Sequence, residues 1–229
     1  MVVSIVAATR YDEEEFWSLS ALGQSLERLH RRTDPNTCIA YENTKGLPEV
    51  YNYFLSERAT DDAIVFVHDD VWIDDYHLVT RIVEGLQWFD VIGVTGNRKR
   101  MAGQPSWNFI DTALTWDDLQ NLSGAIAHGD YPFGEIHYYG PSPAECELLD
   151  GVLLAFRTAS ITQANLSFDP IFRFHFYDLD YCRQARQAGL RLGTWPIAVT
   201  HQSGGVFGST SWHESYRHYL RKLGEAPRP

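Results

Sequence analysis

The stretch "IVFVHDDVWIDD", residues 64–75, joins a run of apolar, β-prone residues to four closely spaced aspartates. Short continuous apolar runs are typical of strands that are buried on both faces of a parallel sheet. The carboxylates that follow this run have two alternative interpretations. They cap the next helix, or they bind a metal ion together with the group that the metal carries.

Strand-like and helix-like segments alternate around this stretch through the first 96 residues of the chain. The predicted strands are residues 2–8, 37–42, 63–69 and 90–96. The predicted helices are residues 16–29, 47–58 and 76–89. This strict alternation predicts an α/β fold with a mostly parallel, Rossmann-like central sheet and helices on both faces.

The alternation stops after Gly96, and residues 97–147 are rich in Gly, Pro, Trp and Asn. Within them, the capping-box pattern "TWDD" predicts a short helix near 115–121, and "GEIHYYG" predicts an isolated strand at 134–140. The later predicted elements are strands at 147–156 and 191–201 and helices at 157–165, 177–190 and 211–223. We expect one domain over residues 1–229, with a regular, nucleotide-binding-like half (1–96) and a less regular half (97–229).

The composition limits the kinds of partner. A formal net charge of −11 repels a phosphate backbone, which argues against nucleic acid as a partner. The three cysteines are widely spaced without a CxxC pair, which suits a reducing compartment rather than a disulfide framework. The N-terminal apolar run is too short for a signal peptide, and no run approaches the ~18 apolar residues of a membrane span. We therefore expect a cytoplasmic protein without a membrane span.

Asp69 and Asp70 follow the third predicted strand at its carboxyl end, where ligands bind in open parallel sheets. Two adjacent carboxylates repel each other, and their burial is costly unless a divalent cation or hydrogen-bond donors compensate. Oxygen ligands suit Mg²⁺ or Mn²⁺, and either ion leaves coordination sites open for a diphosphate. Asp74 and Asp75 lie farther along the chain, and we interpret them as solvated loop or helix-cap residues.

Two further polar clusters lie in the second half of the chain. In "FHFYDLDYC" (174–182), Asp178 and Asp180 occupy the start of a predicted helix, where the helix dipole favours carboxylates for structural reasons alone. A carboxylate there also serves as a general base if it faces the same cleft as Asp70. In "VTHQSGG" (199–205), His201 ends a predicted strand, and it is either a structural residue or a metal ligand.

The order and separation of these clusters resemble the GT-A fold glycosyltransferases, and especially the bacterial glycosyltransferase-like branch of inverting family 2. "GLPEVYNYFLSERATDDAIVFVHDDVWI" resembles the family's Tyr-Asn helix and its metal-binding DxD strand end, and "ELLDGVLLAFRTAS" resembles its acceptor-side segment. The family's block from "EDxD" to a final His is matched by Asp178, Asp180, Cys182, Arg183, Gly189, Pro196 and His201. The resemblance covers roughly residues 2–203. His68 replaces the first Asp of many DxD motifs, and Tyr177 replaces the Glu before the catalytic Asp.

The resemblance implies a metal-dependent, inverting glycosyltransferase of glycan biosynthesis. Its donor would be a nucleoside-diphosphate sugar, its cofactor Mn²⁺ or Mg²⁺, and its acceptor a glycan, lipid-linked or other hydroxyl-bearing molecule. By position, Asp70 and His201 would be metal ligands and Asp178 the catalytic base. The donor-binding residues would be Thr9, Arg10, Glu42, Asn43, Asn52, Asp69, Asp150 and Gly151.

Other interpretations remain. A catalytically silent nucleotide-sugar or glycan-binding module of the same fold would lack the base or a metal ligand, whereas Asp70, Asp178 and His201 are all present. An NAD-dependent Rossmann enzyme would carry GxGxxG after the first strand, but "AATRYDEE" (7–14) contains no glycine. Trp107 is a candidate for stacking on the acceptor, and "NRKR" (97–100) is a candidate phosphate contact. Structural roles are favoured for both.

Overall fold

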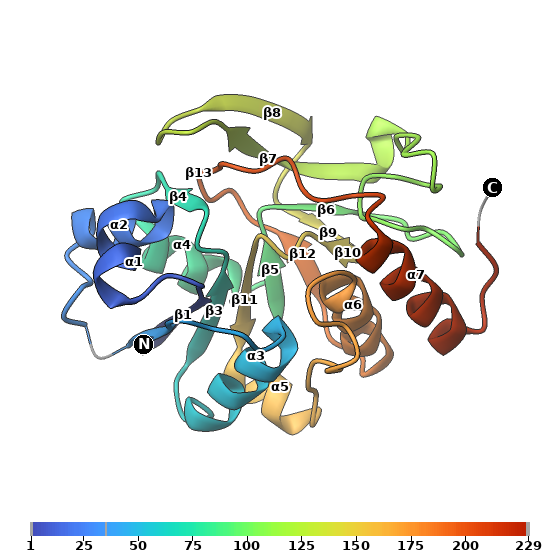
Figure 1. Cartoon of the computed structure of the whole chain (residues 1–229). Helices are drawn as coiled ribbons and strands as arrows, with labels where there is room; N and C mark the ends of the chain where they lie inside the picture. The colour runs from blue at the N-terminus through green and yellow to red at the C-terminus, as the bar shows by residue number, and fades with distance from the viewer. Residues whose placement is uncertain (1, 35, 228–229) are drawn as a thin grey trace.

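The computed structural model describes residues 2–34 and 36–227, and its centre is a seven-stranded sheet in the order β2-β1-β3-β11-β5-β12-β9 (Figure 1). Its strands are β1 (Val3–Ala8), β2 (Thr37–Ala40), β3 (Ala63–Val67), β5 (Val91–Gly93), β9 (Ala144–Glu145), β11 (Leu153–Arg157) and β12 (Leu192–Thr194). β1, β2, β3, β5 and β12 run in one direction, while β9 and β11 run in the other. The predicted mostly parallel sheet is therefore confirmed, with an antiparallel strand at its centre.

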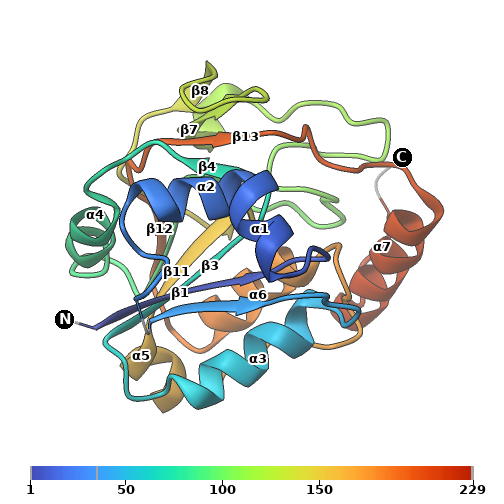
Figure 2. The same ribbon diagram turned by 60° about the vertical axis from the view of Figure 1, so that its left-hand side comes forward.

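Helices cover both faces of this sheet, as predicted (Figures 1 and 2). They are α1 (Glu13–Leu19), α2 (Ala21–Arg28), α3 (Leu47–Glu57), α4 (Leu78–Gly85), α5 (Thr158–Gln163), α6 (Tyr177–Gln187) and α7 (Thr210–Leu223). One face packs against α3, α5, α6 and α7, and the other packs against α1, α2, α4 and the second sheet. Within the described part of the chain, none of the helices is long and apolar enough to cross a membrane.

The strand β3 shows why this region reads as a continuous apolar run. Ile64 and Phe66 belong to the core on one face of the sheet, and Val65 and Val67 belong to the core on the other face. Successive side chains of a strand point to opposite faces, so a strand that is covered on both sides favours an apolar side chain at every position. The first polar residue, His68, comes directly after the last residue of the strand.

A second sheet, which the sequence did not predict, has the order β10-β6-β7-β13-β4, with β8 paired to β7. Its strands are β4 (Val71–Ile73), β6 (Thr95–Asn97), β7 (Leu122–His128), β8 (Glu135–Gly140), β10 (Leu148–Leu149) and β13 (Val199–His201). Four of the six contain only two or three residues, which is too short for a periodic pattern to appear. The strand predicted at 134–140 is present as β8, but it is not isolated, because it pairs along its length with β7.

Three predicted long strands are each divided between the two sheets. Residues 90–96 form β5 and β6, residues 147–156 form β10 and β11, and residues 191–201 form β12 and β13. The chain also passes from the first sheet to the second between β3 and β4. These crossing points bring polar segments to the junction of the two sheets.

The predicted helix at 115–121 is also wrong. Trp116 instead forms an isolated bridge with Phe109, and only Leu119–Asn121 forms a 3-10 turn. The carboxylate of Asp117 accepts hydrogen bonds from the side-chain amides of Asn97 and Asn121, at 2.7 and 2.9 Å. In the pattern "TWDD", Asp117 therefore ties this segment to β6, and Asp118 caps the 3-10 turn rather than an α-helix.

The predicted helix at 16–29 is divided at Ser20 into α1 and α2. The Ser20 hydroxyl donates to the carbonyl of Phe16 (2.7 Å) and accepts from the backbone N–H of Gly23 (2.9 Å), so it ends one helix and caps the next. In the first turn of α2, the backbone N–H of Leu22 donates to the carbonyl of Asp69 at 3.1 Å. This break in the helix therefore supports the segment that follows β3.

We predict that Ser20→Ala lowers the free energy of unfolding by about 1 kcal/mol, because it removes a helix N-cap. Urea denaturation followed by tryptophan fluorescence measures the change. The matched control is Ser18→Ala, since the Ser18 hydroxyl is exposed and bonds only within α1. We expect that control to alter stability by less than about 0.5 kcal/mol. Equal losses in the two variants would contradict the capping role.

Candidate active site

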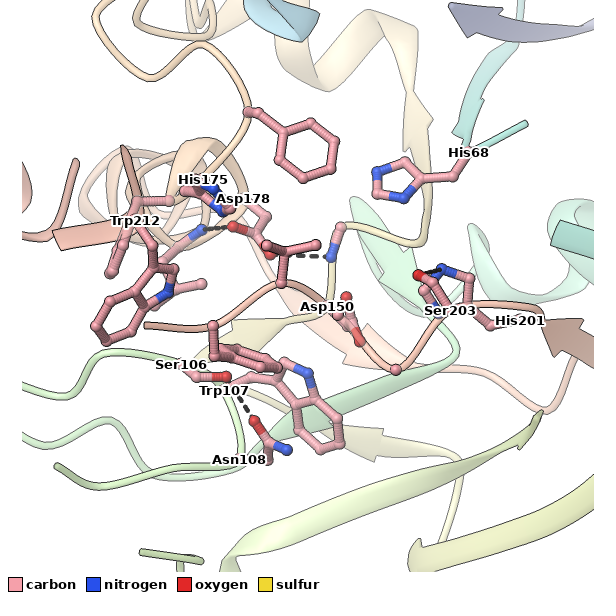
Figure 3. A pocket seen from close by; sticks show the side chains of 18 of the residues that line it. His68, Ser106, Trp107, Asn108, Asp150, His175, Asp178, His201, Ser203 and Trp212 are labelled. Atoms are coloured by element: carbon pink, nitrogen blue, oxygen red, sulfur yellow. Dashed lines mark hydrogen bonds between the residues drawn. The ribbon is translucent and has the colours of Figure 1, made fainter. Parts of the chain in front are cut away.

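A cavity of about 190 Å³ lies where the chain crosses between the sheets. Its lining comes from the β3–β4 and β10–β11 crossings, the start of α6, the end of β13 and the segment 105–108. Figure 3 shows His68, Asp150, Asp178 and His201 around this cavity. Residues that are more than a hundred positions apart in the sequence therefore share one site.

His68, Asp70 and His201 each offer a ligand atom, and these three atoms lie within 4.8 Å of one another. Nε2 of His201 is 3.2 Å from Oδ2 of Asp70. The other carboxylate oxygen, Oδ1 of Asp70, is buried and has no hydrogen-bond partner among the described residues. A buried carboxylate oxygen without a partner, beside two imidazoles, is the donor set expected of a divalent-cation site. These residues therefore fit a metal ion.

The electrostatics of Asp70 and His68 favour metal binding, whereas those of His201 oppose it. Burial by itself raises the pKa of Asp70, but the hydrogen bond and charge of His201 lower it to about 2, so the carboxylate is ionised. Asp70 raises the pKa of His201 in spite of its burial, so a metal ion would compete with a proton for this imidazole. Burial lowers the pKa of His68, which keeps that imidazole neutral, as a metal ligand must be.

Asp178 lies in the first turn of α6 and faces the same cavity (Figure 3). Its Oδ2 accepts a hydrogen bond from the backbone N–H of Gly151 (3.0 Å), and its Oδ1 accepts one from that of Leu179 (2.9 Å). Burial, followed by the nearby charge of Asp150, raises the pKa of Asp178 to about 7. A carboxyl group with a pKa near neutrality is suited to exchange protons as a general base.

The backbone before Asp178 adopts an uncommon conformation. Phe176, the residue that precedes α6, has φ 68°, in the left-handed region that bulky residues rarely occupy. Its ring stacks on Tyr216 of α7, with the ring centroids 5.6 Å apart. This packing holds the tight turn that directs Asp178 toward the cavity, and strained residues of this kind are common at functional sites.

Asp180 has a different role from Asp178, although the two share one cluster in the sequence. Asp180 is buried and accepts hydrogen bonds from Gln184 (2.7 Å) and from Lys222 of α7 (2.8 Å). It does not line the cavity. The ion pair with Lys222 instead fastens α6 to α7.

Gly151 connects the two sides of the site. Its N–H donates to Asp178, and its carbonyl accepts a hydrogen bond from the Tyr177 hydroxyl at 3.0 Å. A Cβ at position 151 would lie 2.3 Å from that hydroxyl oxygen, so only glycine fits. Burial raises the pKa of Tyr177 well above its ordinary value, so the hydroxyl keeps its proton. Nε2 of His68 lies 2.9 Å from the same hydroxyl.

The residues predicted for the nucleotide side lie at the ends of β1 and β2. Thr9 is buried, and its hydroxyl lowers the pKa of Asp69 through a hydrogen bond, while burial raises that pKa more strongly. The carbonyl of Thr9 accepts from the backbone N–H of Asn43 at 2.7 Å. Arg10 and Glu42 are exposed beside them. A smaller cavity of about 100 Å³ is lined by Asp69 together with His68 and Asp70 of the metal-ligand group.

Asn52 is not brought to either cavity. Its amide donates to the carbonyl of Phe168 and accepts from the N–H of Phe168, both at 2.8 Å. Among the basic residues of 97–100, Arg100 pairs with Glu225 at 2.6 Å, away from the cavity. Trp107 does line the cavity, and its buried ring meets that of Tyr139 edge-on at 5.0 Å.

The other two aspartates of the opening stretch are structural. Asp74 is buried rather than solvated, and it accepts hydrogen bonds from the Thr200 hydroxyl (2.6 Å) and the backbone N–H of Phe133 (3.0 Å). Asp75 accepts from the N–H of His77 at 2.8 Å in the turn before α4, but it is not the cap of that helix, whose N-cap residue is His77. Asp74 therefore ties β4 to β13 and to the turn between β7 and β8.

His68 is the metal-ligand candidate that the sequence analysis did not assign. Side chains two residues apart on an extended chain point to the same side. The sequence "HDD" could therefore have indicated that His68 and Asp70 bind the same ion. The role of Tyr177 had no signal in the sequence, because its hydrogen bonds reach partners 26 and 109 positions away.

No protein-family model and no curated protein matches the sequence. Many solved structures resemble the fold, and three of them serve as examples. GalNAc-T7 with UDP, GalNAc and Mn²⁺ has a TM-score of 0.55 and 10% identity, and the match covers 96% of this chain and 48% of that one. The catalytic domain of Drosophila β1,4-galactosyltransferase 7 with xylobiose has a TM-score of 0.51 and 12% identity, with 94% of this chain and 79% of that one covered. A197 from STIV has a TM-score of 0.50 and 9% identity, with 92% of this chain and 98% of that one covered. At these identities the likeness establishes the fold alone. The protein has the mixed α/β architecture of GT-A type glycosyltransferases.

Proposed function

We propose that this protein is a metal-dependent, inverting glycosyltransferase that moves a sugar from a nucleoside-diphosphate sugar to an acceptor hydroxyl. One observation carries the proposal. The metal-ligand group of His68, Asp70 and His201 and the carboxyl group of Asp178 open into the same cavity of a GT-A fold. A cation site opposite a carboxyl of near-neutral pKa is the arrangement that this displacement requires.

The charges of the cavity explain why a cation is needed. Besides two tyrosines, its ionisable lining residues are three aspartates (Asp70, Asp150 and Asp178) and four histidines (His68, His128, His175 and His201). No lysine or arginine is among the described lining residues. His68, Asp70 and His201 would hold a divalent cation, which would supply the positive charge that neutralises a diphosphate leaving group. The two nitrogen ligands favour a transition-metal ion such as Mn²⁺ over Mg²⁺.

In the proposed reaction, the acceptor oxygen forms a bond to the anomeric carbon while the bond from that carbon to the diphosphate oxygen breaks. Asp178 takes the proton of the acceptor hydroxyl, and the backbone N–H groups of Gly151 and Leu179 hold its carboxylate in place. A single displacement of this kind inverts the anomeric configuration. Asp150 and Gly151 would border the donor sugar, since both line the cavity beside Asp178.

The nucleotide would lie at the ends of β1 and β2. Thr9 contacts both Asn43 and Asp69 there, and we propose that these three residues contact the ribose and the base, with the exposed Arg10 and Glu42 at the rim. Asn52 is left out of the proposed donor site, because the backbone of Phe168 already occupies both ends of its amide.

We predict that Asp70→Ala weakens Mn²⁺-dependent binding of UDP or GDP by at least about tenfold, because it removes the anionic metal ligand. Isothermal calorimetry with each nucleotide, with and without Mn²⁺, measures the loss. Asp75→Ala is the control, since that nearby carboxylate caps a turn outside the cavity. If the wild type binds no nucleoside diphosphate in a metal-dependent manner, the proposed function is wrong.

We predict that Asp178→Asn retains Mn²⁺-dependent nucleotide binding but slows sugar transfer by about 10²–10⁴-fold, because the amide cannot accept the proton. A panel of UDP- and GDP-sugars with simple glycoside acceptors identifies a substrate pair, and NMR of the product gives its anomeric configuration. A retained configuration, or transfer at the normal rate, excludes Asp178 as the base of an inverting reaction. Nucleotide-sugar binding without transfer by the wild type indicates a silent binding module.

The pH dependence gives a separate test of Asp178, whose pKa is raised from 3.8 to about 7. The base works only when deprotonated, so the transfer rate should rise as the pH increases through about 7. Stability changes with the opposite sign, because the folded protein retains this proton to a higher pH than the unfolded chain does. Between about pH 4 and 7, Asp178→Asn should therefore become progressively more stable relative to the wild type. Urea unfolding at each pH, without metal, measures this difference, and a constant difference would contradict the raised pKa.

A further inference from the structure

Three polar groups form a buried chain at one wall of the cavity. The Tyr177 hydroxyl donates to the carbonyl of Gly151 at 3.0 Å, and Nε2 of His68 lies 2.9 Å from the same hydroxyl. Tyr177 is only 3% exposed, so solvent does not compete for these contacts. The hydrogen-bonding capacity of each group then determines which atoms carry protons.

A phenol has one proton, and a backbone carbonyl can only accept. Because the Tyr177 hydroxyl gives its proton to Gly151, its oxygen can only accept from His68. Nε2 of His68 must therefore carry a hydrogen. A neutral imidazole has a single N–H, so Nδ1 is left with a free lone pair.

The surroundings allow neither ring to move away. The Tyr177 ring packs against Tyr51 and Phe168, with ring centroids 5.7 and 6.0 Å apart, and the close approach of Gly151 restrains its hydroxyl end. On the other side, the His68 ring stacks on Phe174 at 6.0 Å. Packing therefore restrains both side chains of the hydrogen-bonded chain.

We infer that Tyr177 is a positioning residue, whose hydroxyl holds His68 in the Nε2–H tautomer and so presents the lone pair of Nδ1 to a divalent cation. The inference rests on the proposed function, since the cation is the one assigned to His68, Asp70 and His201. Hydrogen bonds to the second nitrogen of a ligand histidine set its orientation and contribute about 10–100-fold to metal affinity.

The same contacts join the metal ligand to the base. The carbonyl of Gly151 anchors Tyr177, and through it His68, while the N–H of Gly151 anchors Asp178. One peptide segment therefore orients both sides of the site. In this inference Tyr177 acts on the cation through His68, because its hydroxyl is engaged by the carbonyl of Gly151 and by Nε2 of His68.

The test compares Tyr177→Phe with Tyr181→Phe. Tyr181 lies one turn farther along α6 and is equally buried, but its hydroxyl has no hydrogen-bond partner among the described residues. Long-range ¹H–¹⁵N spectra of the metal-free protein report the tautomer of His68, whose signals are assigned by their loss in His68→Gln. Calorimetric titration with Mn²⁺ alone, without nucleotide, gives the metal affinity.

We expect the Nε2–H tautomer in the wild type and in Tyr181→Phe. In Tyr177→Phe, we expect a mixture of tautomers and a Mn²⁺ affinity that is at least about tenfold weaker. An Nδ1–H tautomer in the wild type would overturn the inference. So would a Tyr177→Phe variant that keeps both the tautomer and the affinity. If Tyr177→Phe does not fold, the spectrum of the wild type decides.

The outcomes separate this inference from the proposed function. A wild type that shows the Nε2–H tautomer and binds Mn²⁺, but transfers no sugar, would overturn the function and leave the positioning role intact. A wild type that transfers sugar with His68 in the Nδ1–H form would overturn the positioning role alone.

Discussion

The burial of β3 on both faces is the constraint on which the rest of the site depends. Five consecutive buried residues exclude every polar side chain from the strand. The first polar residues therefore come where the chain leaves the first sheet for the second, and these are His68, Asp69 and Asp70. At that junction, the backbone groups lose the hydrogen-bond partners that a continuous sheet would have supplied. The buried carboxylates need partners as well, and Oδ1 of Asp70 has none among the described residues.

The crossing between β10 and β11 supplies the second half of the site. Asp150 and Gly151 lie in it, and the two sides of the Gly151 peptide unit reach Asp178 and Tyr177. Because a Cβ at position 151 would collide with Tyr177, the absence of a side chain allows α6 to approach this closely. The same piece of backbone thereby positions the metal-ligand group and the proposed base. A displacement of either one would therefore also displace the other.

The charge of the cavity is consistent with its proposed chemistry. Three aspartates without a lysine or arginine in the described lining would repel a diphosphate, just as the net charge of −11 repels other polyanions. In the proposed function, a bound cation would reverse this local repulsion, and donor binding would then depend on the metal. The raised pKa of Asp178 arises from the same crowding, since burial and the charge of Asp150 both favour its protonated form.

The sequence by itself determined the features that depend on neighbouring residues. Continuous apolar runs marked β1 and β3, helical spacing marked α3 and α6, and the aspartates at the end of β3 marked the edge of the sheet at which the cavity lies. Only the tertiary structure decided the second sheet, because strands of two or three residues carry no periodic pattern. It also separated Asp178 from Asp180. These residues are two positions apart on a helix, so their side chains are rotated by about 200° around the helix axis. The sequence does not indicate which of the two side chains faces the cavity. The partners of His68 and Tyr177 were hidden for the same reason, since their hydrogen bonds exist only once distant segments have packed together.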